Sequence, residues 1–252
     1  MYELVGLESE PPVAWITLRR PEKLNALSDQ VLKELRSALS SLEEDRNTSV
    51  IAITGAGERA FCAGADVEEL ASLPEERVLE ANMLGHRVFE SIERLRKPVI
   101  AAINGYALGG GLELALACDL RVAASGSRMG LPEVSLGVIP GWGGTWRLRE
   151  AVGSGRAREM ILTGRLLDAD EALGAGLLSR IVPGQRLREE VIELAALLSA
   201  NSPDGLAAAK GALLGAAPQT EALARVESGS VASLVAGEDF RRRFEQRFGG
   251  RG

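Results

Sequence analysis

The sequence of 252 residues predicts an α/β fold in which a core of parallel strands and helices is followed by a helical C-terminal region. Three observations predict this fold. Short apolar runs of strand length recur through the first half, amphipathic helical patterns separate them, and from about residue 186 the pattern is helical with few β-branched runs. Strands separated by helices imply parallel pairing. We therefore expect an α/β core over residues 1–185 that carries the active site, and a helical region over 186–252 that packs on the core or on another subunit.

The elements of the first half follow from their residue patterns. The three predicted strands are compact apolar runs, each bounded by Pro, Gly or Asn, and they cover Val13–Leu18, Val50–Gly55 and 99–104. Between the first two lies an amphipathic helix that begins after Ser28. Its apolar face consists of Val31, Leu32, Leu35, Leu39 and Leu42. A second amphipathic helix is expected over residues 74–95, between the second and third strands.

Composition and charge exclude several classes of protein. The net charge is −6, the pI is about 5.1, and acids and bases are mixed along the chain, which argues against a nucleic-acid partner. No apolar run reaches the length of a membrane span, and the N-terminus lacks the basic flank and apolar core of a signal peptide. Two cysteines do not make a disulfide framework and fit a reducing compartment. We expect a cytoplasmic protein with no membrane partner.

Two turns share a pattern that can support chemistry. The strand Val50–Gly55 leads to residues 61–66 (FCAGAD), and the strand at 99–104 leads to residues 108–113 (LGGGLE). In both turns a small residue is followed by Gly, one further residue and an acid, and a helix is expected to begin there. Two helix starts with free N–H groups and no bulky side chains can form an oxyanion hole. The alternative is that the glycines permit tight turns and the acids stabilise helix starts. Neither turn has the spacing of a phosphate-binding loop or of the dinucleotide fingerprint.

Two glutamates lie in apolar surroundings and can divide acid and base duties. Glu113 falls in the first turn of an otherwise apolar helix expected over residues 112–120, and Glu133 follows Pro132 in another apolar stretch. Carboxylates in different environments can act as an acid and a base. The alternative is that both simply occupy helix starts, where Glu and Pro are common.

Other residues favour less specific roles. His86, the only histidine, lies within the helix expected over 74–95, where a structural or surface role is favoured. A single histidine excludes a His-rich metal site, and the cysteines lack zinc spacing, so we expect no metal. No Gly-x-Ser-x-Gly elbow is present. Trp142 and Trp146 flank Gly143-Gly144-Thr145 and either anchor the core or line a pocket.

Together, these motifs resemble the enoyl-CoA hydratase/isomerase (crotonase) superfamily over nearly the full length of the chain. The matching stretches are residues 18–27, 60–66, 97–119, 131–148 and 162–165. The resemblance implies a spiral of ββα units, followed by C-terminal helices that assemble homotrimers, often paired into hexamers. It implies a coenzyme A thioester as the substrate and no other cofactor. Members of the family act in fatty-acid, amino-acid and aromatic degradation.

The resemblance also assigns roles to residues. It implies that the N–H groups of Ala63 and Gly110 form the oxyanion hole and that Glu113 and Glu133 are the catalytic acids. Gly141 matches the glycine near the catalytic water. The other implied substrate contacts are Ala63, Gly64, Ala65 and Asp66 along the thioester, and Lys23, Leu24 and Ala26 near the adenine of coenzyme A. The sequence departs from the family pattern at Trp146, where glutamine is common, and at Trp142, where a small residue is common, which leaves the acyl preference open.

The function expected from these roles is reversible addition of water to a 2-enoyl-CoA, giving a 3-hydroxyacyl-CoA. In the usual hydratase assignment Glu133 gives a proton to carbon and Glu113 assists the water as base. One alternative is an enoyl-CoA isomerase, which generally keeps only one acid. Another is a non-catalytic member that binds RNA or serves in assembly, which the acidic pI and the intact acid pair disfavour.

Overall fold

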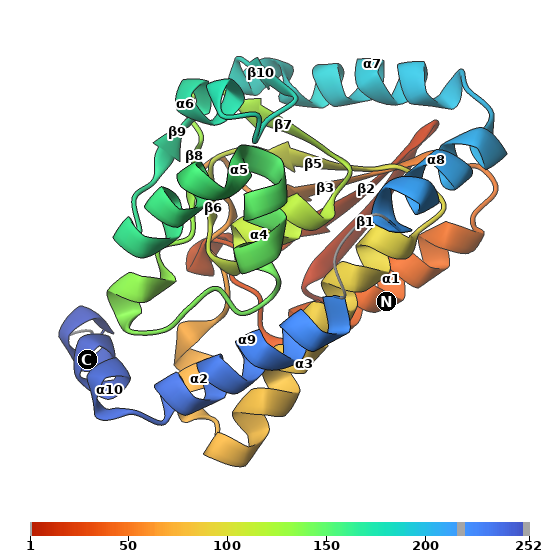
Figure 1. The fold of residues 1–252 in the computed structure, drawn as a ribbon. Helices are drawn as coiled ribbons and strands as arrows, with labels where there is room; N and C mark the ends of the chain where they lie inside the picture. Colours follow the sequence, from red (N-terminus) through yellow and green to blue (C-terminus); the bar gives the residue numbers. More distant parts are fainter. Residues whose placement is uncertain (1, 216–219, 249–252) are drawn as a thin grey trace.

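The larger of two β-sheets forms the centre of the computed structural model, which describes residues 2–215 and 220–248 (Figure 1). In spatial order, its six strands are β1 (Val5–Glu10), β2 (Val13–Leu18), β3 (Val50–Gly55), β5 (Val99–Ile103), β7 (Leu120–Ala124) and β10 (Arg180–Val182). β1 and β2 form an antiparallel hairpin, and every other neighbouring pair is parallel. The parallel pairing expected from the alternation of strands and helices is therefore confirmed.

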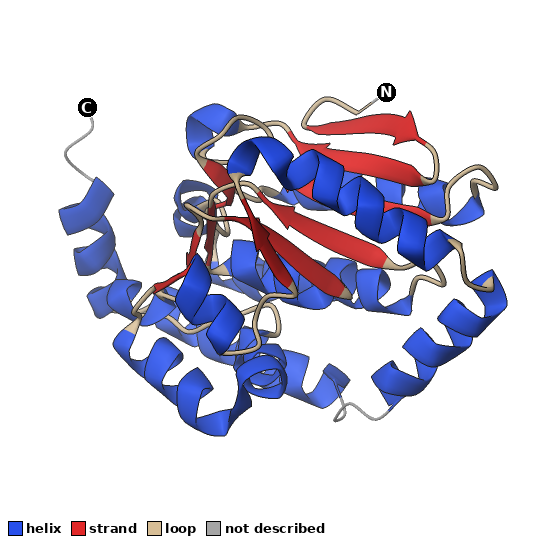
Figure 2. Ribbon diagram, turned by 90° about the horizontal axis from the view of Figure 1, so that it is seen from above, coloured by secondary structure: helices blue, strands red, loops and turns tan. Residues whose placement is uncertain are grey.

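The second sheet consists of short strands. They are β4 (Ala60–Cys62), β6 (Tyr106–Leu108), β8 (Arg128–Gly130) and β9 (Leu167–Asp168), in that spatial order. The chain adds strands to the two sheets alternately, β3 and β4, then β5 and β6, then β7 and β8, and helices follow each pair. This repeat is the predicted spiral of ββα units. In Figure 2 helices lie on both sides of the strands.

The helices of the core agree with the amphipathic patterns. Their bounds, with those of the 3₁₀ turns, are η1 (Pro21–Lys23), α1 (Asp29–Glu44), α2 (Val67–Ser72), α3 (Glu75–Arg94), α4 (Gly110–Ala117), η2 (Glu133–Leu136), α5 (Gly144–Thr163), α6 (Ala169–Gly174) and η3 (Gly184–Arg186). Ser28 caps α1 by accepting the N–H of Val31 at 3.3 Å, and the predicted apolar face of α1 is buried. The helix expected over 74–95 is α3, for which Pro74 is the N-cap and Leu95 the C-cap.

Two predicted boundaries are corrected. The third strand ends at Ile103 rather than at residue 104, because the side-chain amide of Asn104 donates to the carbonyls of Gly55 and Gly57 and turns the chain. The helix expected over 112–120 is α4, which begins at Gly110 and ends at Ala117. It ends early because Asp119 pairs with the start of β5: its N–H donates to the Val99 carbonyl at 2.9 Å, and its carboxylate accepts the Val99 N–H at 2.7 Å.

The C-terminal region is helical, as predicted. Its helices are α7 (Leu187–Ser199), α8 (Pro203–Gly215), α9 (Thr220–Val235) and α10 (Glu238–Phe248). α7 covers one face of the six-stranded sheet, on which its Leu187, Val191 and Leu194 are buried. α9 runs alongside α3 (Figure 1), and α10 packs against η2. Residues 216–219 and 249–252 of the predicted helical region lie outside the described residues.

Several apolar side chains of the C-terminal helices are not covered by the chain's own core. Val231 and Val235 are buried, whereas Leu213 and Val226 are 79% and 67% exposed. The expected trimer stays a prediction, and these side chains are the surface that it would cover.

The described part of the chain also bears on membrane and metal binding. No helix in it is long and apolar enough to cross a membrane. Within the same ranges, no three side chains of His, Cys, Asp or Glu gather as metal ligands. Cys62 and Cys118 are buried free thiols, and burial raises the pKa of each to about 12.

Candidate active site

The two matching turns lie side by side. β4 and β6 are parallel neighbours, so the turns that follow them emerge at the same edge of the small sheet. Gly64 and Gly109 both have positive φ, of 103° and 52°, which favours glycine. A Cβ on Gly64 would lie 2.9 Å from the carbonyl oxygen of Leu108 and 3.2 Å from the nitrogen of Gly110. Only glycine at position 64 allows the two turns to approach this closely.

The free N–H groups of the turns belong to Ala65 and Gly110. Neither of these two groups donates to an acceptor among the described residues. A Cβ on Gly110 would lie 3.3 Å from the Ala65 nitrogen, which places the two groups together. The N–H of Ala63, by contrast, donates to the Leu24 carbonyl at 3.0 Å. The prediction that Ala63 supplies an oxyanion donor is therefore wrong, and Ala65 is the residue of this turn with a free N–H.

A short ladder between distant segments explains this correction. Residues 24–27 run beside residues 63–66, and Leu27 forms a parallel bridge with Ala65. The ladder takes the N–H groups of Ala63 and Asp66, the latter donating to the Leu27 carbonyl at 3.0 Å, and leaves that of Ala65 free. The spacing of residues 61–66 alone does not contain this information.

The same ladder places the predicted adenine-binding residues. Leu24 accepts the N–H of Ala63, the ammonium group of Lys23 lies 3.6 Å from the carboxylate of Asp66, and Ala26 precedes Leu27 in the ladder. Their contact with adenine stays a prediction. Lys23 is partly exposed, with its ammonium group 2.6 Å from the carboxylate of Glu68. Asp66 itself serves the fold: its carboxylate caps α2 by accepting the N–H of Glu69 and pairs with Arg20 at 2.8 Å. For Asp66 the helix-start interpretation of the sequence describes the side chain correctly.

Glu113 is a buried carboxylate held by backbone donors. It lies in the first turn of α4 and is 1% exposed. Its Oε1 accepts the N–H of Trp142 at 2.8 Å and the N–H of Gly144 at 2.6 Å, so it binds the start of α5 as well as its own helix. A carboxylate used only to stabilise the start of α4 would not bind the start of another helix.

Glu133 lies at the start of η2 and faces the second turn. A Cβ on Gly109 would lie 2.9 Å from its Oε1, so the carboxyl group is adjacent to the free N–H of Gly110. Its Oε2 is buried and has no hydrogen-bond partner in the described chain. Burial raises the pKa of this carboxyl to about 8.

The two glutamates are electrostatically coupled. Burial raises the pKa of Glu113 well above its ordinary value, and the charges of Glu133 and Glu227 raise it further, while the N–H groups of Trp142 and Gly144 oppose the shift. Partly desolvated carboxylates that raise one another's pKa do not readily ionise together, so a proton is retained within the cluster at neutral pH. The sequence offered two interpretations of Glu113 and Glu133, as a pair or as separate residues of helix starts. Their electrostatic coupling in the structure agrees with the pair.

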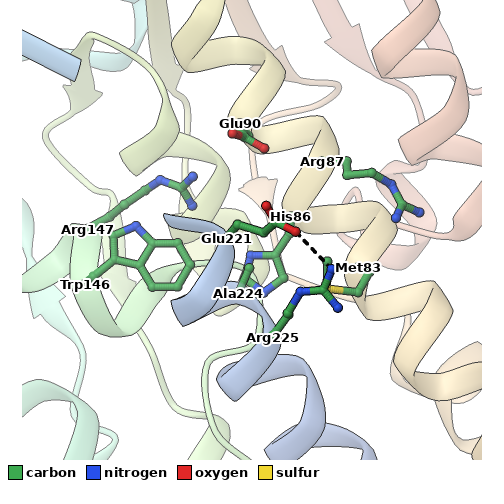
Figure 3. Close-up of a pocket in the computed structure, with 9 residues that line it drawn as sticks. All are labelled: Met83, His86, Arg87, Glu90, Trp146, Arg147, Glu221, Ala224 and Arg225. Carbon is green, nitrogen blue, oxygen red and sulfur yellow. Dashed lines mark hydrogen bonds and ion pairs between the residues drawn. The ribbon is translucent and has the colours of Figure 1, made fainter. Parts of the chain in front are cut away.

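The two tryptophans occupy different places. The ring of Trp142 lies against Gly110 and Gly85, packs edge-on against Phe89 and is 7% exposed. It therefore borders the predicted oxyanion site. Trp146 is stacked on His86 at a centroid distance of 5.6 Å and lines a pocket of about 310 Å³ (Figure 3). Neither Glu113 nor Glu133 lines that pocket.

Gly141 and His86 both lie near the two tryptophans. Gly141 precedes Trp142 and is held under α3, where Asn82 donates to its carbonyl at 2.8 Å. His86 is buried rather than on the surface, and burial, together with the charge of Arg147, lowers its pKa to about 3. It is therefore neutral at neutral pH.

Sequence reasoning missed Glu227. This residue of α9 is 3% exposed and accepts the N–H groups of Gly143 and Thr145. A signal was present in the sequence: Glu227 lies on the buried stripe of α9 that includes Ala224, Val231 and Val235. An acid on the apolar face of a helix is a candidate for a buried, functional role.

Comparison with known proteins identifies the family. Residues 8–243 match the family model described as Enoyl-CoA hydratase/isomerase. The short-chain-enoyl-CoA hydratase of Clostridium acetobutylicum is 43% identical over 209 residues, which are 83% of this chain and 80% of that protein. The crotonyl-CoA hydratase of Syntrophomonas wolfei is 43% identical over 194 residues, 77% of this chain and 75% of that protein. The crystal structure of an enoyl-CoA hydratase from Bacillus anthracis is 40% identical, with a TM-score of 0.83 and 97% of both chains covered. With a family match over nearly its whole length, and relatives that agree in sequence and fold, this chain belongs to the enoyl-CoA hydratase/isomerase family.

Proposed function

We propose that this protein is an enoyl-CoA hydratase, which adds water reversibly to a 2-enoyl-CoA to give a 3-hydroxyacyl-CoA. One observation carries the proposal: two glutamates, the buried Glu113 and the partly buried Glu133, lie at the two turns that present the free N–H groups of Ala65 and Gly110. The names of the relatives support the same activity, since two of them are a short-chain-enoyl-CoA hydratase and a crotonyl-CoA hydratase.

In this proposal the N–H groups of Ala65 and Gly110 bind the thioester oxygen. As water attacks the third carbon of the acyl chain, negative charge moves onto that oxygen. Backbone donors that are already in place stabilise this charge without reorganising. The positive end of the α4 dipole, at Gly110, acts in the same direction.

The two glutamates divide the proton transfers. Burial and the charges of Glu133 and Glu227 raise the pKa of Glu113 as well, so the pair shares a retained proton. We place the charge of the pair on Glu113, because its Oε1 accepts two N–H groups whereas the Oε2 of Glu133 has no partner in the described chain, and we assign Glu113 the role of base that takes a proton from water. Glu133 has a pKa of about 8 and is mostly protonated at neutral pH, so we assign it the role of acid that gives a proton to the second carbon. Hydroxyl and proton together make one water, so the atoms balance. These steps need no metal or redox cofactor.

The other proposed substrate contacts are residues that lie beside the two turns. Residues 63–66 are proposed to lie along the thioester, and Lys23, Leu24 and Ala26 beside them to approach the adenine of coenzyme A. The ring of Trp142, next to Gly110, is proposed to limit the acyl group. Gly141, one residue earlier, is proposed to lie near the attacking water.

Assembly and location are part of the same proposal. We propose a homotrimer, or a dimer of trimers, that covers exposed apolar side chains such as Leu213 and Val226. We also propose that the protein works in the cytoplasm without a nucleic-acid partner, in keeping with its free thiols and net charge of −6.

The experiment that tests the function is a hydration assay. A panel of 2-enoyl-CoA thioesters of varied length and branching is mixed with the protein, and the loss of the conjugated enoyl absorbance is followed. We expect turnover of at least one thioester. Failure with all of them would overturn the proposal.

Two variants decide whether both glutamates act. Glu113→Gln and Glu133→Gln should each reduce hydration by roughly 10²–10⁴-fold, the usual contribution of a positioned acid or base. Glutamine keeps the shape of the side chain but cannot exchange the proton. Thioester binding should largely survive, because the oxyanion donors are backbone groups. Near-normal hydration by Glu113→Gln, with loss only in Glu133→Gln, would instead favour a single-acid isomerase.

A further inference from the structure

The start of α5 is held by two carboxylates from different parts of the chain. Four consecutive N–H groups, at residues 142–145, donate alternately to Glu113 and Glu227. Glu113 accepts those of residues 142 and 144, and Glu227 accepts those of residues 143 and 145, at 2.8 and 3.2 Å. The hydroxyl of Thr145 also donates to Glu227. Every one of these four donors is therefore paired with one of the two acids.

We propose that Glu227 is a positioning residue for Glu113: by holding the alternate N–H groups of residues 142–145, it fixes the segment that orients the Glu113 carboxylate. This inference rests on the proposed function. Free N–H groups at a helix start need partners, and a carboxylate is the strongest side-chain acceptor. Without Glu227 the buried N–H of Gly143 and the partly buried N–H of Thr145 would lose their acceptor. The segment would then shift, and with it the two donors that hold Glu113.

Several charged or titratable groups lie near the carboxylate of Glu227. The Nε2 of His86, which is neutral at neutral pH, lies 3.6 Å from the carboxylate of Glu227. Burial raises the pKa of Glu227 to about 7, against the opposing effect of its bonds to Thr145 and Gly143. The charged or titratable groups that face it are His86 from α3, Arg147 from α5, Glu113 from α4 and Glu133 from η2. Arg147 is itself paired with Glu93 of α3 at 2.7 Å.

Through Glu227, the C-terminal helical region contributes a side chain to the candidate active site. α9 lies alongside α3, and the pocket of Figure 3 opens between them, lined by His86, Trp146 and Arg147 among others. Glu227, on the same helix as the lining residues Glu221 and Ala224, accepts N–H groups from the start of α5. The helical region thus contributes an internal contact that orients the proposed base, in addition to any role in assembly.

The test compares Glu227→Gln with Glu221→Gln. Glu221 belongs to the same helix, is exposed and pairs with Arg225, so its substitution controls for loss of a charge on α9. Glutamine at 227 has one acceptor oxygen and places an amide N–H₂ against a backbone donor. We expect kcat for hydration of crotonyl-CoA to fall by about 10- to 100-fold, as for a small displacement of a reacting group, with KM changed by less than about threefold.

The pH profile gives a readout that a purely structural role would not change. Removal of the negative charge at 227 should lower the apparent pKa values of the Glu113–Glu133 pair, because a neighbouring like charge raises them. The profile of kcat should therefore move to lower pH by about 0.5 to 1 unit. Glu221→Gln should retain the wild-type profile.

The outcomes separate this inference from the proposed function. Absence of hydration by the wild-type protein would refute the function, whereas the ratio of variant to wild type tests the positioning role. A folded Glu227→Gln protein with wild-type kcat and pH profile would overturn the inference, even if its melting temperature fell. If Glu227→Gln does not fold, Glu227→Asp, which keeps the charge but withdraws the carboxylate from the N–H groups of Gly143 and Thr145 by one methylene, should lower kcat by about threefold or more at unchanged KM. Wild-type kcat in that variant would overturn the inference equally.

Discussion

Replacing Glu133 by glutamine should stabilise the protein at alkaline pH while it lowers the proposed activity. The Oε2 atom of Glu133 is buried without a hydrogen-bond partner among the described residues, and burial raises the pKa of the carboxyl to about 8. In the folded chain its charged form lacks the solvation that water gives it in the unfolded chain. Glutamine has nearly the same shape and is neutral at every pH, so the substitution removes the cost of burying the charge.

The magnitude follows from the two protonation equilibria. Below about pH 4.5 the group is protonated in both states, and its contribution does not depend on pH. As the pH rises from there to about 8, the unfolded chain releases the proton while the folded chain retains it, so the folded wild type loses stability throughout this window. At about 1.36 kcal/mol per pH unit, the full separation corresponds to about 5 kcal/mol. Because Glu133 is only partly buried, screening by water reduces this, and we expect about 2 to 4 kcal/mol.

Urea unfolding of wild type and Glu133→Gln at about pH 5 and about pH 9 measures this difference. The protein concentration is held constant, because assembly makes stability depend on it. The free energy of unfolding of the variant, relative to wild type, should rise by about 2 to 4 kcal/mol between the two pH values. Glu221→Gln is the control, and its effect should be the same at both pH values within about 0.5 kcal/mol. An equally constant difference for Glu133→Gln would refute the argument that burial keeps this carboxyl protonated.

The remaining predictions concern the paired acids, the acyl group and assembly. The double variant Glu113→Gln/Glu133→Gln should lose much less activity than the product of the two single losses, because residues that act as a unit are not additive; losses that multiply in the hydration assay would indicate independent roles. Trp142→Ala should raise kcat/KM for longer or bulkier enoyl-CoA thioesters relative to crotonyl-CoA by about tenfold or more, because it removes a ring that lies against Gly110. Trp146→Phe, in the separate pocket, is the matched control and should keep the wild-type preference, and an unchanged preference in a folded Trp142→Ala protein would make Trp142 a purely structural residue. Light scattering at micromolar concentration should give the mass of a trimer or of two trimers, and a monomer would contradict the proposed assembly.

The parts of the fold that the sequence predicts are those set by neighbours along the chain. The bounds of β2 and β3 are as expected, and α1 begins after Ser28 with the predicted face buried. The strands of the second sheet were missed because two or three residues are too few to show a periodicity. The end of α4 was misplaced because it depends on the pairing of Asp119 with β5, which the local apolar pattern does not show.

Some residues of the candidate site could be found from the sequence and others could not. Glu113, Glu133 and Gly110 could be selected from motifs, because each lies at the start of a predicted helix and the two turns share a pattern. Glu227 could not be connected to them, since 84 residues separate it from Gly143, whose N–H it accepts. Its place on the buried stripe of α9 was visible in the sequence, but its partner was not.

The sequence by itself determined the α/β class, the alternation of three core strands with helices in the first half, the family and the choice of the two glutamates, because each of these depends on residue types and spacings within a short stretch. Only the tertiary structure decided which backbone groups are free. The ladder between residues 24–27 and 63–66 occupies the N–H of Ala63 and leaves that of Ala65 available, and the packing of α9 brings Glu227 to the start of α5. Hydrogen bonds between distant segments depend on how those segments align in space, and a one-residue change in register changes which donor is used.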